Sequence, residues 1–429
     1  MIIYMPIILE NHSSTSLTLQ PHQVLTILST SPSPTNRSLN LHKMWKLHCM
    51  IICLMAACLL ASSLNVSFTE VANATQRRAV CMDGSPAGYY YSAGSGDGAK
   101  NWLLFLMGGG WCDNVDDCQS KLNQSLGSSR SMPFTKFSDI LSPDSQINPD
   151  FYNWNRIFVA YCDQSSFLGD TEFDGQGPKL QFRGSRIFDT VVDDLLAKGM
   201  GIGENAILSG ISAGGLATIL HCDGFRARLP DVGRVKCLSD GGFFFRGENV
   251  LNADYREKYF ASVITLHNIS SLLPVTCTER IDPSLCFFPE NLVRDIQTPI
   301  FILDSAFDAY QVRLRLVPPL SDDRIRWDLC LGNISTCTST DKQLITDFGG
   351  AFLKAVREIS NNPTIGMFIH ACLIHTVLID GRFWTPNSTI KLGNLSIQEA
   401  FANWYFDREP VRLITTANFL EICTKKKML

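Results

Sequence analysis

The stretch "AILSGISAGGLATIL", residues 206–220, joins two apolar runs through the pentapeptide Gly210-Ile211-Ser212-Ala213-Gly214. The first run has the length and composition of a buried strand, and the second has those of a helix. A G-x-S-x-G pentapeptide between a strand and a helix is typical of a nucleophile elbow, the sharp turn that exposes a reactive serine. Small residues flank Ser212 because a bulky side chain would clash in so tight a turn. The alternative is that Ser212 only caps the helix.

Strand-like and helix-like segments alternate from about residue 81 onward. The segments are 101–107, 156–162, 187–200, 205–210, 215–229, 298–304, 341–359 and 363–374. This alternation favours βα units and a mainly parallel central sheet flanked by helices. Together with the turn at Ser212 it predicts an α/β-hydrolase-like fold. No linker divides residues 75–410, so we expect them to form one catalytic domain.

The ends of the chain differ from this central part. Residues 1–43 are rich in Ser, Thr and Pro without a sustained period, which predicts a gene-model extension or a disordered leader. Residues 44–72 carry flanking lysines, a short apolar stretch and small residues, which is typical of a secretory signal peptide. A membrane anchor is the alternative, but the stretch is short for a span. Residues 411–429 read as a divergent tail.

Charge and cysteine content narrow the function classes. The net charge is −4 and the only basic run is Lys425–Lys427, so we expect no nucleic-acid partner. Of 15 cysteines, twelve follow the signal-like stretch, an even number that predicts disulfides. Zinc-ligand spacings are missing from the sequence, so we expect no metal site. Six N-x-S/T sequons follow the signal-like range 44–72 and agree with an exported chain, at Asn73, Asn123, Asn268, Asn333, Asn387 and Asn394.

A reactive serine needs backbone N–H donors for the oxyanion, and a glycine-rich segment offers them. "FLMGGGWC", residues 105–112, ends a predicted strand in three glycines, as in the loop that supplies such donors in esterases. We expect the amides of Gly109, Gly110 and Ala213 to form the oxyanion hole. The alternatives for the glycines are a flexible turn or a phosphate cradle, but no Walker lysine follows.

The base and the acid must follow the serine in the chain if the order is Ser, Asp or Glu, His. Four histidines follow, at His221, His267, His370 and His375. His221 lies on the helix after the elbow, where a structural role is expected. His375 lies beyond the apolar run 363–374 and suits a loop better than His370, although spacing alone leaves both open.

The acid should lie just after the strand 298–304, where it can orient the imidazole. Asp304 and Asp308 both meet this condition. A turn-capping carboxylate is the alternative for Asp304, and a solvated loop charge is the alternative for Asp308. The sequence pattern does not separate the two.

Longer blocks of sequence resemble the plant pectin acetylesterases, relatives of the animal carboxylesterase Notum. The resemblance covers about residues 81–408 and rests on seven blocks: "GGGWCDNVDDC" (108–118), "FYNWNRIFVAYCDQSSFLGD" (151–170), "FRGSRIF" (182–188), "DDLLAKGM" (193–200), "SAGGLATILHCD" (212–223), "CFFPENLV" (286–293) and "NWYFDR" (403–408). The family's acid lies in a motif similar to "FDAYQ", which implies Asp308, and its base follows a cysteine by three residues, which implies His375 after Cys372.

The resemblance therefore implies a secreted serine esterase that releases acetate from acetylated pectin in the plant cell wall, with no cofactor. The residues implied are the triad Ser212, Asp308 and His375, with oxyanion donors at Gly109, Gly110 and Ala213. Two further hypotheses stay open, a deacylase acting on lipidated or other esters and a catalytically impaired carbohydrate-binding relative.

Three departures from the family pattern motivate the impaired relative. Met107 stands where the family has an acidic residue, and Thr376 stands where it has a cysteine. The second departure bears on a disulfide of the family, so twelve cysteines do not by themselves imply six bridges, and the pairing stays open. The tail 411–429 also lacks the family's cysteine- and proline-rich ending.

Overall fold

The computed structural model describes residues 64–419 apart from 176, 249, 251–252, 317–323 and 360, and it also describes Cys423. Residues 1–43 and most of the predicted signal peptide lie outside the described residues. Two ranges that the sequence sets apart contribute to the fold. Residues 64–70, in the range read as a signal peptide, and residues 412–414, in the range read as a tail, both form strands of the central sheet.

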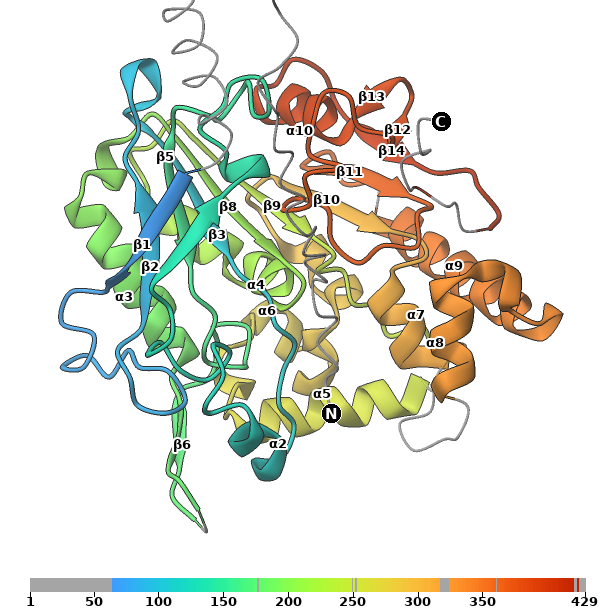
Figure 1. The fold of residues 1–429 in the computed structure, drawn as a ribbon, viewed down its shortest axis with the longest axis horizontal. Helices are drawn as coiled ribbons and strands as arrows, with labels where there is room; N and C mark the ends of the chain where they lie inside the picture. The colour runs from blue at the N-terminus through green and yellow to red at the C-terminus, as the bar shows by residue number, and fades with distance from the viewer. Residues whose placement is uncertain are drawn as a thin grey trace, which may run out of the picture. The chain divides into compact units, whose positions relative to one another are not determined.

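A ten-stranded sheet forms the centre of the described chain, in the order β14-β11-β10-β9-β8-β3-β5-β2-β1-β4 (Figure 1). The seven strands from β14 to β5 are parallel to their neighbours, and the three at the other end pair antiparallel. The strands are β1 (Leu64–Glu70), β2 (Gly88–Ser92), β3 (Asn101–Leu106), β4 (Phe134–Phe137), β5 (Asn155–Val159), β8 (Asn205–Ile211), β9 (Arg234–Asp240), β10 (Ile300–Ser305), β11 (Ile365–His370) and β14 (Arg412–Ile414). The predicted mainly parallel sheet is confirmed.

Two small hairpins lie outside this sheet. One pairs β6 (Thr171–Phe173) with β7 (Leu180–Phe182), and the other pairs β12 (Lys391–Leu392) with β13 (Leu395–Ser396).

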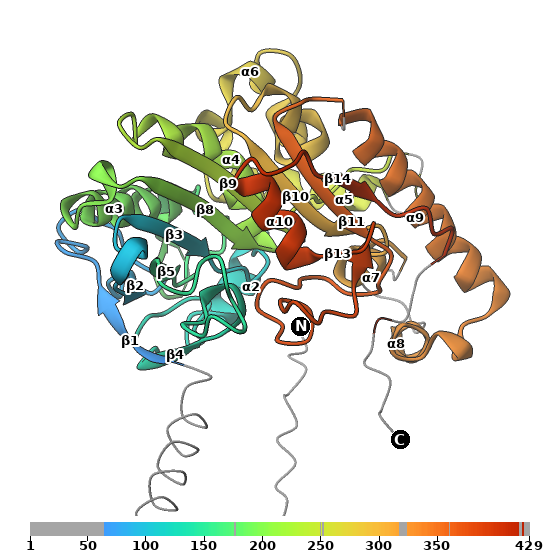
Figure 2. The ribbon, with the colours of Figure 1, turned by 90° about the horizontal axis from the view of Figure 1, so that it is seen from above.

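Helices cover both faces of the sheet because its strands alternate apolar side chains between two cores. Leu104 and Leu106 join the core that contains α3, α4 and α9, while Leu103 and Phe105 join the core that contains α10 (Figure 2). The helices are α2 (Val115–Ser120), α3 (Gly184–Ala197), α4 (Ala213–Ala227), α5 (Ala253–Leu266), α6 (Val275–Thr278), α7 (Ala309–Leu316), α8 (Arg324–Gly332), α9 (Ser339–Ile359) and α10 (Ile397–Tyr405). The predicted flanking of the sheet by helices is confirmed.

Disulfides tie the loops to this frame. The bridges are Cys81–Cys162, Cys112–Cys118, Cys222–Cys237, Cys277–Cys286, Cys330–Cys337 and Cys372–Cys423. All twelve cysteines after the signal-like stretch are paired. The predicted disulfides are confirmed, and the pairing that the sequence left open includes a bond from Cys372 to Cys423 in the tail, although Thr376 stands where the family has a cysteine.

Candidate active site

Ser212 lies in the turn between β8 and α4, with φ 55° and ψ −125°. Such a backbone is strained for a residue with a side chain, and the surrounding glycines make it possible. A Cβ on Gly210 would lie less than 3.0 Å from the carbonyl oxygen of Gly214, and a Cβ on Gly214 would lie less than 3.0 Å from that of Leu106. The Ser212 side chain makes no capping hydrogen bond to α4, so helix capping does not account for it.

Three side chains from distant parts of the chain form one hydrogen-bonded line. The Oγ of Ser212 lies 2.7 Å from Nε2 of His375, and Nδ1 of His375 lies 2.7 Å from Oδ2 of Asp308. An ionised Asp308 can only accept, so it selects the tautomer with the proton on Nδ1 and leaves Nε2 to accept from the serine hydroxyl. The residues follow β8, β10 and β11, whose carboxyl ends lie at the same edge of the sheet (Figures 1 and 2).

The other candidate acid and base occupy different places. Asp304 is buried and accepts hydrogen bonds from the backbone amides of Phe243 and Ser305 at 3.1 and 2.7 Å. Burial, together with the charge of Asp308, raises the pKa of Asp304 well above its ordinary value. His370 is buried at the end of β11, and its Nδ1 accepts from the amide of Cys372 at 3.2 Å. The structure thus brings Asp308 and His375, and neither Asp304 nor His370, into line with Ser212.

His221 lies away from this line. Its ring stacks on Phe188 with 3.9 Å between centroids, and its Nε2 lies 3.0 Å from the carbonyl oxygen of Phe167. Burial lowers the pKa of His221 to about 4, which keeps the ring neutral. These contacts agree with the structural role expected from its place on the helix.

The glycine-rich loop after β3 lies against the nucleophile turn. A Cβ on Gly108 would lie 2.7 Å from the Cβ of Ser212, so only glycine permits this approach. Gly110 adopts φ +70°, a conformation that glycine takes without strain. Among the described residues, no hydrogen bond uses the amides of Gly109, Gly110 or Ala213 as donors. These three amides are thus free to donate to a bound ligand.

Buried side chains fix the peptide groups around these amides. Tyr161 donates from its hydroxyl to the carbonyl oxygen of Gly110 at 2.7 Å, and Ser166 donates to that of Ala213 at 2.8 Å. Trp111 in turn donates from Nε1 to the Ser166 hydroxyl at 2.8 Å. Each of these bonds fixes one peptide plane, that of Gly110–Trp111 or that of Ala213–Gly214, and so restrains the backbone on the carboxyl side of Gly110 and Ala213. Sequence reasoning missed Tyr161 and Ser166, since nothing local relates them to the loop.

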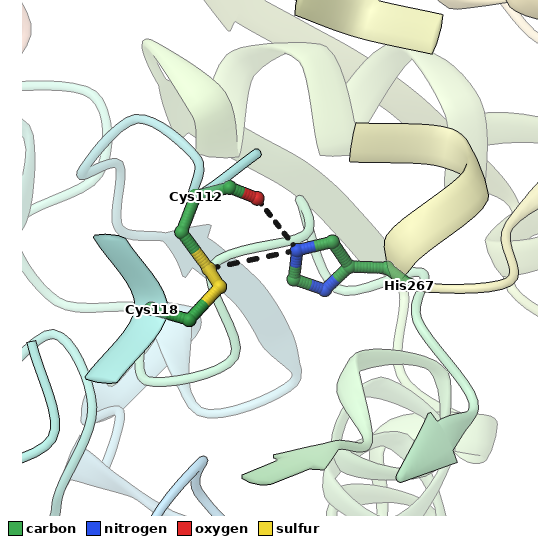
Figure 3. Close-up of side chains that lie close together, drawn as sticks. All are labelled: Cys112, Cys118 and His267. Carbon is green, nitrogen blue, oxygen red and sulfur yellow. Dashed lines mark hydrogen bonds between the residues drawn. A yellow bond between two sulfur atoms is a disulfide. The ribbon is translucent and has the colours of Figure 1, made fainter. Parts of the chain in front are cut away.

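Cys112, Cys118 and His267 place ligand-type atoms within 4.8 Å of one another just beyond this loop (Figure 3). The two sulfur atoms form a disulfide, and a disulfide lacks the thiolate charge by which cysteine binds zinc. His267 Nε2 lies 2.9 Å from the carbonyl oxygen of Cys112, to which it can donate. The cluster therefore acts as an anchor for the segment that follows the glycines.

Asp240 at the end of β9 touches both halves of the site, and sequence reasoning missed it. Its carbonyl oxygen accepts from the amide of Ser212 at 2.8 Å, and its carboxylate accepts from the amides of Val377 and Leu378 at 2.7 and 2.8 Å. Asp240 could have been found from its position, because it ends a strand in the same way as Asp304 follows an apolar run near the end of β10. Burial raises the pKa of Asp240 to about 7 despite these two donors.

Charges around His375 set its protonation. Burial alone would lower the pKa of His375, but the charge and hydrogen bond of Asp308, together with the charge of Asp240, raise it above its ordinary value. The ring is therefore a stronger base than an isolated imidazole.

Aromatic rings occupy the space beside His375. Tyr310 stacks on the imidazole with 4.9 Å between centroids and an interplanar angle of 23°, and Phe244 lies 6.0 Å from both rings. Trp111 packs edge-on against Phe244 at 5.0 Å. These aromatic rings therefore form an apolar wall beside the imidazole of His375.

Comparisons with known proteins identify the family. The pectinacetylesterase family model matches residues 59–424. The chain belongs to the pectinacetylesterase family. Pectin acetylesterase 7 of Arabidopsis thaliana is 39% identical over 367 residues, covering 85% of this chain and 94% of that protein. Pectin acetylesterase 11 of the same plant is 39% identical over 80% of this chain and 88% of its own length.

More distant pectinacetylesterase relatives come from animals. Palmitoleoyl-protein carboxylesterase notum2 of Xenopus laevis is 28% identical over 70% of this chain and 60% of that protein. The solved structure of the Wnt deacylase Notum from Drosophila superposes with a TM-score of 0.70 at 25% identity, covering 83% of this chain and 98% of that one. Both groups of relatives make this chain a carboxylic ester hydrolase, and the resemblance seen in the sequence is confirmed.

Proposed function

We propose that the chain is a serine esterase that removes acetyl groups from pectin. His375 takes the proton of Ser212 at Nε2 while Oγ attacks the acetyl carbonyl carbon, and the amides of Gly109, Gly110 and Ala213 hold the oxyanion. The imidazolium then gives its proton to the departing sugar oxygen, leaving acetyl-Ser212. Water attacks this ester with His375 again as base, and acetate leaves.

The observation that carries this proposal is the hydrogen-bonded line from Ser212 through His375 to Asp308, with 2.7 Å in each step. Asp308 stabilises the imidazolium that forms when the serine loses its proton. The serine, imidazole and carboxylate supply both the nucleophile and the proton transfer, so the mechanism calls for no cofactor. The name and identity of the plant relatives support acetylated pectin as the substrate.

We further propose that the protein is exported to the cell wall, with the signal peptide ending before β1 so that this strand stays in the sheet. All six asparagines of the sequons are exposed in the structure, as glycosylation during export would require. Six disulfides also suit an oxidising compartment. Within the described part of the chain, no helix combines the length and apolar character needed to cross a bilayer.

Replacement of Ser212 tests the esterase. We expect Ser212→Ala to lower acetate release from acetylated pectin by about 10³-fold or more, because the nucleophile is gone. Ser209→Ala is the matched control, since Ser209 is buried on β8, the strand that leads to Ser212, and its hydroxyl lacks a partner among the described residues. Acetate release by Ser212→Ala at the wild-type rate would contradict the proposal.

The animal relatives give a specific reason to consider a second function, cleavage of long-chain acyl esters. A series of synthetic esters from acetate to octanoate separates the two functions. The plant relatives favour acetate, and a preference for octanoate would support the deacylase instead. A catalytically impaired relative would bind pectin without turnover and would leave Ser212 unlabelled by an organophosphate.

A further inference from the structure

The strand β1 lies at the same edge of the sheet as the nucleophile. Two antiparallel pairings separate β1 from β5, so β1 runs in the direction of β5, β3 and β8. The register is continuous, because Thr69 lies opposite Tyr89 and Tyr89 opposite Val159. Val159 lies opposite Leu106, which in turn lies opposite Gly210. The carboxyl end of β1 is therefore level with the turn that holds Ser212, four strands away.

A groove of about 810 Å³ opens at this end of β1. Three segments line it, namely the end of β1, the loop before β2 and the loop before β4, which Figure 1 shows together at one side of the sheet. The lining residues that matter for binding are Phe68, Glu70, Arg130, Met132 and Pro133. Four strand spacings place the groove about 19 Å from Ser212 along the sheet. A polymer can reach both places at once, whereas a single sugar cannot.

The wall of the groove and the oxyanion loop belong to one connected segment. Residues 107–133 run from the three glycines to the groove without entering the sheet. A Cβ on Gly109 would lie 2.5 Å from the side chain of Leu126, and the carbonyl oxygen of Gly127 accepts from the amide of Asp83 at 3.1 Å. Ser85 also accepts from the amide of Ser129 at 3.0 Å, which joins two walls of the groove. The groove is thus formed before a ligand binds.

The groove has the chemistry of a site for acidic sugars. The side chain of Arg130 is 72% exposed and its ion pair with Asp83 is long, at 3.5 Å, so the guanidinium can turn to a ligand carboxylate. Phe68, Met132 and Pro133 offer apolar surface to the face of a sugar ring. Glu70 can accept hydrogen bonds from sugar hydroxyls, as carboxylates do.

We propose that this groove is a second binding site for the pectin chain whose acetylated unit lies at Ser212. In it, Arg130 binds the carboxylate of a distant galacturonate unit. This proposal rests on the proposed esterase function and adds an extended, polymeric substrate to it. It predicts that polymer binding and the chemistry at Ser212 can be altered separately.

The test compares an acetylated polygalacturonate with 4-nitrophenyl acetate, which is too small to span the two sites. We expect Arg130→Gln to raise KM for the polymer about five- to tenfold, with kcat and the hydrolysis of 4-nitrophenyl acetate unchanged. Arg130→Lys should recover part of the affinity because it keeps the charge. Arg294→Gln is the matched control, since Arg294 is exposed in the segment that enters β10 from the opposite edge.

Each outcome is decisive for one proposal. A wild-type KM for the polymer in Arg130→Gln, or an equal loss on both substrates, would overturn the groove while leaving the esterase intact. A wild-type protein that hydrolyses neither substrate would instead overturn the esterase function.

Discussion

Two buried aspartates at the carboxyl end of β10 offer the sharpest test of which residue is the catalytic acid. Asp304 and Asp308 are both essentially inaccessible to solvent and lie four positions apart, yet only Asp308 contacts His375. We expect Asp308→Asn to lower kcat by about 10⁴-fold, which corresponds to about 5.5 kcal/mol in the barrier. The amide cannot stabilise the imidazolium, and it favours the wrong tautomer of the ring.

Asp304→Asn should behave differently, although it removes a carboxyl group from the same region. Burial and the charge of Asp308 raise the pKa of Asp304 well above its ordinary value, and this carboxyl group contacts backbone amides and not His375. Asparagine keeps one acceptor oxygen for the amide of Phe243 and loses the acceptor for the amide of Ser305, which lowers stability but leaves the contact between Asp308 and His375 in place. We therefore expect kcat to stay within about threefold of wild type.

The assay is the initial rate of 4-nitrophenyl acetate hydrolysis, with acetate release from pectin measured in parallel. Thermal unfolding of both variants shows whether each one is folded. If Asp304→Asn lost as much activity as Asp308→Asn while both were folded, the assignment of the acid would be refuted. Full activity of Asp308→Asn would refute it equally.

Further predictions concern the base, its support and the nucleophile turn. Because His375 has to be neutral to accept a proton, kcat/KM should fall as the pH drops through a value above about 6.5, and a profile flat to pH 5 would contradict the raised pKa. Asp240→Ala leaves the two buried amides of Val377 and Leu378 without an acceptor, so the free energy of unfolding in urea titrations should fall by about 2–6 kcal/mol. Asp240→Asn keeps an acceptor, so its free energy of unfolding should fall much less. Gly214→Ala should cost about 1–3 kcal/mol and most of the activity, since the added methyl overlaps the carbonyl oxygen of Leu106; a wild-type melting temperature would exclude that overlap.

The fold and the nucleophile turn could be predicted from sequence because their signals are local. The pentapeptide around Ser212 and the apolar runs on either side lie within 15 residues, and the alternation of strands and helices is visible along the chain. The choice between Asp304 and Asp308 as the catalytic acid does not depend on a local signal. Both lie at the carboxyl end of the same apolar strand. Only the tertiary contacts distinguish them, because Asp304 accepts from the backbone amide of Phe243 and Asp308 contacts the ring of His375.

Contacts between distant segments account for what sequence reasoning missed. Cys81 and Cys162 are 81 residues apart, and nothing in their spacing relates them. Asp240 supports a loop 137 residues further along the chain, a relation that exists only once β9, β10 and β11 are side by side. The strand β1 was not predicted for another reason, because its residues follow directly after the signal-like stretch and were included in it.

The bond between Cys372 and Cys423 gives the synthesis of this protein a fixed order. The strand that leads to His375 is linked covalently to a residue 51 positions later, so the link can close only after Cys423 has emerged from the ribosome. A shortened or alternatively spliced transcript without that cysteine would leave the thiol of Cys372 unpaired, three positions from His375. In an oxidising compartment an unpaired, accessible thiol forms mixed disulfides with other proteins or with small disulfides. Expression hosts and tags at the carboxyl end should be chosen with that vulnerability in mind.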